Sequence, residues 1–127
     1  MVYCSGVAAR NLVLKVTVGK DQPERCGQAL SVAATAAASG IAVSLWLTGE
    51  ASWMALPGRA ADIELPHSPP FPDLLANVLA TGTVTLCSQC AVRRAIEPGD
   101  VIDGIRIAGA PTFVAEITAG ETQALVY

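Results

Sequence analysis

The chain has 127 residues, of which 52% are hydrophobic and 15% are charged, so it can form one domain around a sizeable core. Its net charge of −3 and its pI near 4.9 argue against a general nucleic-acid binder, because such proteins need a basic surface to displace counterions. The uncharged segment from Ala29 to Leu47 is divided by Gly40 into an alanine-rich half and a β-branched half. This pattern favours a buried helix followed by a buried strand over a membrane span.

The N-terminal residues MVYCSGVAAR have neither the basic start nor the apolar run of a secretory signal. We interpret residues 1–10 as a leader that can be flexible, and we expect residues 11–127 to form a single domain. Four cysteines in a core-rich chain are more typical of reduced thiols than of a small disulfide-stapled secreted domain. We therefore expect a soluble cytoplasmic protein that binds neither membrane nor nucleic acid.

Apolar runs and helical patterns alternate along the chain and predict five strands separated by helices. The expected strands are 11–18, 41–47, 83–86, 105–107 and 123–127, and the expected helices are 73–80, 88–95, 111–118 and a helix that begins at Pro23 and stops at Gly40. The last helix should turn Phe113, Val114 and Ile117 inward.

Several of these strands are continuous apolar runs, which is typical of a parallel sheet covered on both faces. The predicted fold is a three-layer α/β domain with a five-stranded, mainly parallel sheet and helices on both faces, in a doubly wound, flavodoxin-like arrangement. Residues 53–72 hold five of the eight prolines, so we expect an irregular loop there rather than long regular structure.

Two cysteines lie three residues apart in the stretch TVTLCSQC, which runs from a strand into a helix. Cys87 follows the third expected strand, at the sheet edge where ligands gather in parallel α/β folds. Ser88 is a plausible N-cap, and the free amide groups of the helix start favour a thiolate at Cys87. Cys90 lies about one turn further along, within reach of the first sulfur.

Four interpretations of this pair remain open. Both cysteines can be small buried hydrophobic residues, or they can form half of a zinc site that Cys4, Cys26 and His67 would have to complete. They can also form a thioredoxin-type redox couple. The fourth interpretation is a single nucleophilic or sulfur-carrying thiolate at Cys87 with Cys90 as an auxiliary thiol.

Three segments together resemble the DsrE/DsrF-like family of small sulfur-relay proteins: LVLKVTVGKDQPERCGQALSVAATAAASGIAVSLWLTGEAS, ATGTVTLCSQCAVRRAI and IDGIRIAGAPTFVAEI with the final ALVY. The resemblance covers residues 11–127, with the proline-rich middle matching poorly. Ala95 stands where the family often has glycine. The resemblance implies that Cys87 corresponds to the cysteine that bears a persulfide in active relay members.

The resemblance also implies a sulfur donor and a sulfur acceptor protein as partners, no metal or organic cofactor, and a homo-oligomer, commonly a trimer or hexamer. The resulting hypothesis is a sulfur carrier or sulfurtransferase that uses Cys87 and Cys90, with the proline-rich loop as a cover that places His67 or Trp53 near the sulfur. The alternatives are a non-catalytic oligomeric or small-ligand-binding protein and a thiol–disulfide redox protein.

Overall fold

The computed structural model describes residues 10–127, so the expected leader lies almost entirely outside the described part of the chain. The strands are β1 (Asn11–Val16), β2 (Ala42–Leu47), β3 (Thr83–Cys87), β4 (Ile105–Ala108) and β5 (Thr122–Val126). The α-helices are α1 (Pro23–Ala38), α2 (Phe71–Thr81), α3 (Ser88–Arg93) and α4 (Ala110–Ile117). Three short 3-10 helices, η1 (Gly49–Ala55), η2 (Arg59–Asp62) and η3 (Pro98–Asp100), lie in the connections.

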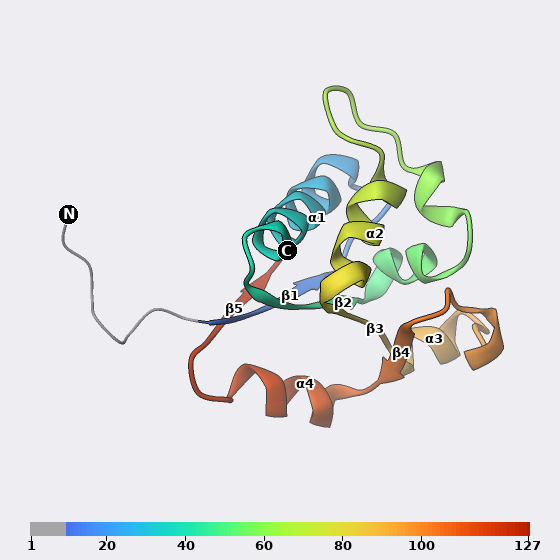
Figure 1. The fold of residues 1–127 in the computed structure, drawn as a ribbon. Helices are drawn as coiled ribbons and strands as arrows, with labels where there is room; N and C mark the ends of the chain where they lie inside the picture. The colour runs from blue at the N-terminus through green and yellow to red at the C-terminus, as the bar shows by residue number, and fades with distance from the viewer. Residues whose placement is uncertain (1–9) are drawn as a thin grey trace.

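All five strands are parallel and form one sheet in the order β4-β3-β2-β1-β5. The chain crosses the sheet stepwise from β1 to β4 and then returns to place β5 beside β1. Helices α1 and α2 cover one face, and α4 covers the other during the return (Figure 1). The predicted three-layer α/β class is confirmed. The strand order itself differs from the 2-1-3-4-5 order of a flavodoxin sheet.

The face beneath α1 and α2 is aliphatic and holds the main core. Alternation along β1 places Leu12, Leu14 and Val16 on this face. Leu45 of β2 lies in register with Leu14, and Leu86 of β3 lies in register with Leu47 of β2. Helix α1 presents small side chains to this face, which allows the helix to pack closely against the sheet. The apolar positions that recur at helical spacing along α1 are all buried: Cys26, Ala29, Leu30, Ala33 and Ala37.

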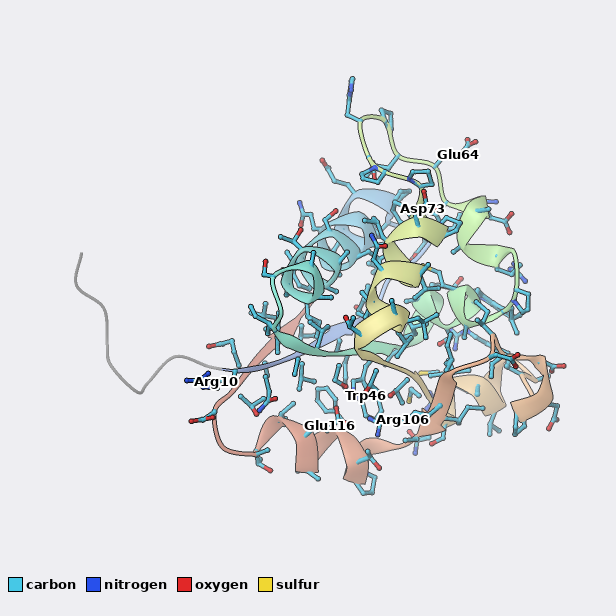
Figure 2. The ribbon with its side chains drawn as sticks, viewed as in Figure 1. Arg10, Trp46, Glu64, Asp73, Arg106 and Glu116 are labelled. Atoms are coloured by element: carbon cyan, nitrogen blue, oxygen red, sulfur yellow. The ribbon has the colours of Figure 1, made fainter. Side chains whose placement is uncertain are left out.

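The opposite face carries polar side chains that meet helix α4. Glu116 of α4 accepts hydrogen bonds from Ser44 Oγ at 2.6 Å and from Trp46 Nε1 at 3.0 Å, and it pairs with Arg106. Figure 2 shows Trp46, Arg106 and Glu116 gathered between the sheet and α4. The ring of Phe113 packs edge-on against that of Trp46, with centroids 5.3 Å apart. A single carboxylate therefore links α4 to two strands of the sheet.

The prediction that Val114 turns inward is wrong, because 52% of this residue is exposed. Phe113 and Ile117 are half-buried, and α4 contains no fully buried residue. The helix instead faces the sheet with Phe113 and Glu116, which are separated by three residues and so share one side. The apolar pattern alone did not reveal that a charged residue occupies the inward side of this helix.

Helix α3 ends two residues earlier than predicted, in a Schellman turn. Ile96 N–H donates to Ala91 O at 2.9 Å and Ala95 N–H donates to Val92 O at 3.1 Å. This turn requires a left-handed residue between the helix and Ile96, and Ala95 adopts it with φ of 55°. Glycine usually occupies this position because a Cβ atom is strained there.

No helix within residues 10–127 is both long enough and apolar enough to cross a membrane. The alanine-rich part of the uncharged segment is the helix α1, and its second half is the strand β2, as the division at Gly40 predicted.

We predict that Glu116→Gln lowers the free energy of unfolding at neutral pH by about 1–3 kcal/mol, because it weakens charge-assisted hydrogen bonds in a half-buried site. Burial acts to raise the pKa of Glu116, but the bonds from Ser44, Trp46 and Arg106 outweigh it and lower the pKa. The stabilisation is therefore complete above the unfolded pKa of roughly 4.3 and is lost as pH falls through the lowered folded pKa.

Urea unfolding at several pH values measures this effect. The stability difference between wild type and Glu116→Gln should shrink in acid. Glu121→Gln serves as the control, because Glu121 is exposed and its carboxylate forms a long surface ion pair with Arg10 at 3.9 Å. This substitution should change stability little. Equal effects of the two substitutions would contradict the role given to Glu116.

We predict that Ala95→Gly raises the free energy of unfolding by about 0.5–1 kcal/mol, because glycine removes the left-handed strain at an exposed position. Ala115→Gly in the exposed part of α4 is the matched control and should destabilise, since its backbone is helical. Urea midpoints that fall for both variants would show that Ala95 is not strained.

Candidate functional site

The cysteine pair lies at the carboxyl edge of the sheet, where β3 passes into α3. The helices that follow β2 and β4 lie on opposite faces, so the end of β3 between them is at the switch point where ligands gather in such sheets. Cys87 is the last residue of β3 and is half-buried, so its thiol is open to partial solvent access. The predicted N-cap role of Ser88 is wrong: Cys87 occupies the cap position, and Ser88 is the first helical residue.

Cys90 is 7% exposed and accepts a hydrogen bond from the connection that follows strand β2. The backbone N–H of Gly49, directly after β2, donates to Cys90 Sγ at 3.3 Å. Gly49 has φ of 52°, and a Cβ atom built there would lie 2.4 Å from the carbonyl oxygen of Thr17. A residue with a side chain would therefore displace the backbone that brings this N–H to the sulfur.

Two further polar groups surround Cys90. Ser52 in η1 is fully buried, and its hydroxyl has no hydrogen-bond partner in normal geometry among residues 10–127. Arg94 follows Cys90 by four residues, so it lies on the same side of α3, and its Nη1 donates to Cys90 O at 3.3 Å. Glu50 holds the guanidinium from η1, with Arg94 Nη2 2.9 Å from Glu50 Oε2. The charge of Arg94 is thereby fixed beside the buried sulfur.

These contacts change the acidity of Cys90. Burial acts to raise its pKa, but the Gly49 N–H, the Cys87 thiol, the Ser52 hydroxyl and the positive charge of Arg94 together lower it. Cys26 shows the opposite environment: it is fully buried in α1, its sulfur lies 3.9 Å from Met54 Sδ, and burial with the charge of Asp21 raises its pKa to about 12. The contacts that favour a thiolate converge on one of the two buried cysteines in the described chain.

Trp53 lies in the same part of the molecule as the pair, in η1. Its ring is stacked by Arg94 at 5.8 Å and by Arg59 at 4.9 Å, and it borders a small cleft of about 140 Å³ with Glu50 and Met54. Trp53 was expected near the site. It contacts Arg94, and its ring helps to hold that side chain in place.

His67 lies elsewhere. It is exposed in the loop between η2 and α2, with φ of 60°, and it borders an open groove against α1 that includes Glu24 and Gln28. This loop projects at the top of Figure 1, whereas α3 lies at the lower right. The structure does not bring His67 to the cysteine pair, and the cover over the site comes instead from η1.

The segment 98–103 is joined to the end of η1, because Ile102 N–H donates to Ala55 O at 2.9 Å. Within residues 10–127 no group of three or more His, Cys, Asp or Glu side chains is placed to hold a metal ion, and Cys4 lies outside the described residues.

The sequence reasoning missed Gly49, Ser52 and Arg94 as partners of Cys90. Two signals were available in the sequence. The four-residue spacing from Cys90 to Arg94 predicts a shared helix side. The segment LTGE follows the strand next to β3, so its loop meets the end of β3 at the same sheet edge. Arg94 binds the end of the helix through Cys90 O, and its positive charge also acts on the Cys90 sulfur.

We predict that Arg94→Gln shifts the pH profile of Cys90 alkylation to higher pH, because it removes the cation and leaves the Glu50 carboxylate beside the sulfur. The thiolate fraction at neutral pH should fall severalfold. Peptide mass spectrometry after timed iodoacetamide pulses separates Cys90 from Cys87 and Cys26. Arg93→Gln is the matched control, because Arg93 is exposed on the same helix. Coincident profiles for wild type and Arg94→Gln would contradict the electrostatic role.

The fold and the site are similar to known proteins. The model of the DsrE/DsrF-like family matches residues 11–123. Among solved structures, the YchN protein from E. coli superposes with a TM-score of 0.77 at 19% identity, over 93% of this chain and 99% of that one. The protein MTH1491 from Methanobacterium thermoautotrophicum, described as of unknown function, gives a TM-score of 0.62 at 11% identity, over 92% of this chain and 98% of that one.

The protein BT1422 from Bacteroides thetaiotaomicron, also described as a conserved protein of unknown function, gives a TM-score of 0.57 at 14% identity, over 93% of this chain and 95% of that one. Among curated proteins, none matches this chain. The structural likenesses lie below 25% identity and therefore establish the shared fold. The family model spans nearly all of the described residues, and on that match the chain belongs to the DsrE/DsrF-like family.

Proposed function

We propose that this protein is a sulfur carrier that accepts a sulfane sulfur from a donor persulfide onto Cys87 and passes it to an acceptor thiol. Membership of the DsrE/DsrF-like family supports a role in sulfur relay. The observation that carries the proposal is the position of Cys87. It is a half-buried residue at the carboxyl edge of the sheet, at the start of the helix whose first turn holds Cys90, a second cysteine whose surroundings favour a thiolate.

This position suits the chemistry of a persulfide. A sulfur carrier needs a thiol that a donor protein can reach, and Cys87 is more accessible than Cys90. It also needs shielding of the adduct from stray thiols, which a half-buried site beside η1 and α3 supplies. The exchange requires no metal or organic cofactor, only donor and acceptor proteins. We also propose a homo-oligomer, trimer or hexamer, for which the exposed side chains of Val92 and Val114 are candidate contacts.

Thiol–disulfide exchange is a second candidate function, and it is favoured by the placement of Cys87 at the N-cap and Cys90 at the third position of α3, on one side of the helix start. An exchange protein would cycle between the dithiol and a Cys87–Cys90 disulfide with a measurable potential. A purely packing role for both cysteines is less well supported, because a packed cysteine has no use for a donated N–H, a buried hydroxyl and a fixed cation.

We predict that incubation with a cysteine desulfurase and free cysteine adds about 32 Da, one sulfur atom, to the peptide that contains Cys87. Cys87→Ser should abolish this adduct, whereas Cys26→Ala should leave it intact because Cys26 is a buried thiol with a raised pKa. Intact-protein and peptide mass spectrometry without reductant provide the measurement. Wild type and Cys87→Ser with the same sulfur content would reject the carrier function.

A further inference from the structure

The surroundings of Cys90 are built to hold a negative charge on a buried sulfur. The Gly49 N–H points at Sγ, and Arg94 is fixed nearby by Glu50 and Trp53. A buried charge is costly unless it is paired and hydrogen-bonded, so these contacts are needed for a thiolate and superfluous for a thiol. Cys26 is more deeply buried than Cys90, and within residues 10–127 the one hydrogen-bond contact of its sulfur is with Met54 Sδ, which is sufficient for a thiol.

The hydroxyl of Ser52 adds an independent observation. Ser52 is 0% exposed, and its Oγ has no partner in normal geometry within residues 10–127. A buried hydroxyl without a partner costs about 1–3 kcal/mol, so native structures seldom keep one without a use. A hydroxyl hydrogen rotates freely, and the Ser52 hydroxyl acts to lower the pKa of Cys90. The Cys90 sulfur is therefore the acceptor toward which this hydroxyl can turn.

On the basis of the carrier function proposed above, we infer that Cys90 is the attacking thiolate of the pair and discharges a sulfur carried on Cys87 as hydrosulfide. Gly49, Ser52 and Arg94 are positioning residues that keep Cys90 ionised. The two cysteines thereby have different roles. The accessible Cys87 carries the sulfane sulfur, and the buried Cys90 releases that sulfur when no acceptor protein has taken it.

The placement of the two cysteines determines which sulfur is attacked. Cys87 is the N-cap and Cys90 is the third residue of α3, so their side chains share one side of the helix start and Sγ of Cys87 is within reach of Cys90 Sγ. In the loaded protein this atom is the inner sulfur of the persulfide Cys87–Sγ–SH. Attack by the Cys90 thiolate forms a bond between the two Sγ atoms and breaks the bond to the outer sulfur, which leaves with the electron pair as HS⁻.

The step balances without a further reagent. The two cysteine sulfurs lose two electrons in forming a disulfide, and the sulfane sulfur gains them in becoming hydrosulfide. The outer sulfur keeps its proton, and the negative charge passes from Cys90 to HS⁻. A dithiol reductant then returns the pair to its starting state by exchange. Cys87 at the N-cap and Cys90 at the third helical position share one side of the helix start, which suits such a bridge.

The rate of discharge should depend on pH through the groups around Cys90: the Cys87 sulfur at the end of β3, Arg94 at the C-cap of α3 and Glu50 in η1. Ser52→Ala and Arg94→Gln should each slow discharge near neutral pH and move its pH profile to higher pH, because both favour the protonated thiol. If these residues had only a structural role, their substitution would change the maximal rate of discharge and leave the midpoint of its pH profile unchanged. Arg93→Gln is the control and should behave as wild type.

The test loads the full chain with sodium polysulfide, removes the excess and follows two products. Wild type should release one hydrosulfide per loaded chain and become lighter than the reduced protein by about 2 Da, the mass of the two hydrogens lost in a disulfide. Cys90→Ser should keep the sulfur on Cys87 and release hydrosulfide at least about tenfold more slowly, because water and the remaining groups offer no comparable nucleophile. Equal release rates for wild type and Cys90→Ser would overturn the inference.

A second arm separates this inference from the carrier function. Cys87 is converted to a mixed disulfide with thionitrobenzoate, whose release by intramolecular attack is followed by absorbance. Wild type should release it rapidly and Cys90→Ser slowly, whether or not the protein accepts sulfur. Failure to load sulfur with rapid thionitrobenzoate release would reject the carrier function and retain Cys90 as the attacking thiolate. Equal rates of thionitrobenzoate release from wild type and Cys90→Ser would reject Cys90 as the attacking thiolate.

Discussion

The hydrogen bond from the Gly49 N–H to Cys90 Sγ joins the loop after β2 to the helix after β3, and the chemistry of the site depends on it. The close approach is possible because residue 49 has no side chain to meet the Thr17 carbonyl. The same loop supplies Ser52 to the sulfur and Glu50 to Arg94, so one backbone turn sets the hydrogen bonding, the polarity and the charge around Cys90. A small displacement of this turn would return Cys90 to an ordinary buried thiol.

The two faces of the sheet contribute to stability in different ways. The aliphatic face beneath α1 and α2 supplies most of the apolar burial that stabilises the fold. The other face is held by the polar contacts of Glu116 with Ser44, Trp46 and Arg106, which give α4 a defined position at the cost of little buried apolar area. Stability thus comes mainly from one face, and the reactive pair lies at the sheet edge, outside that main core. This separation lets the site be partly open without exposing the core.

The order of elements and the three-layer class could be predicted from the sequence, because strand runs and the alanine-rich helix have clear periods. The inward face of β1 and the buried side of α1 follow from the same patterns. The strand order and the inward side of α4 did not follow, since hydrophobic spacing cannot show that Glu116 finds partners on two strands. At the site, the position of Cys87 at the end of β3 was predictable. It was not predictable that the surroundings stabilising a thiolate belong to Cys90, because Gly49 and Ser52 reach Cys90 only through the pairing of β2 with β3.

The central claim is that the surroundings of Cys90 lower its pKa and favour its thiolate in the folded, reduced protein. A titration of the ultraviolet absorbance of thiolates, taken as the difference between Cys87→Ser and the Cys87→Ser, Cys90→Ser double variant, measures this sulfur alone. A midpoint below the ordinary cysteine pKa of roughly 8.5 is the expected result. A midpoint at or above that value would show that the contacts around Cys90 do not hold a thiolate.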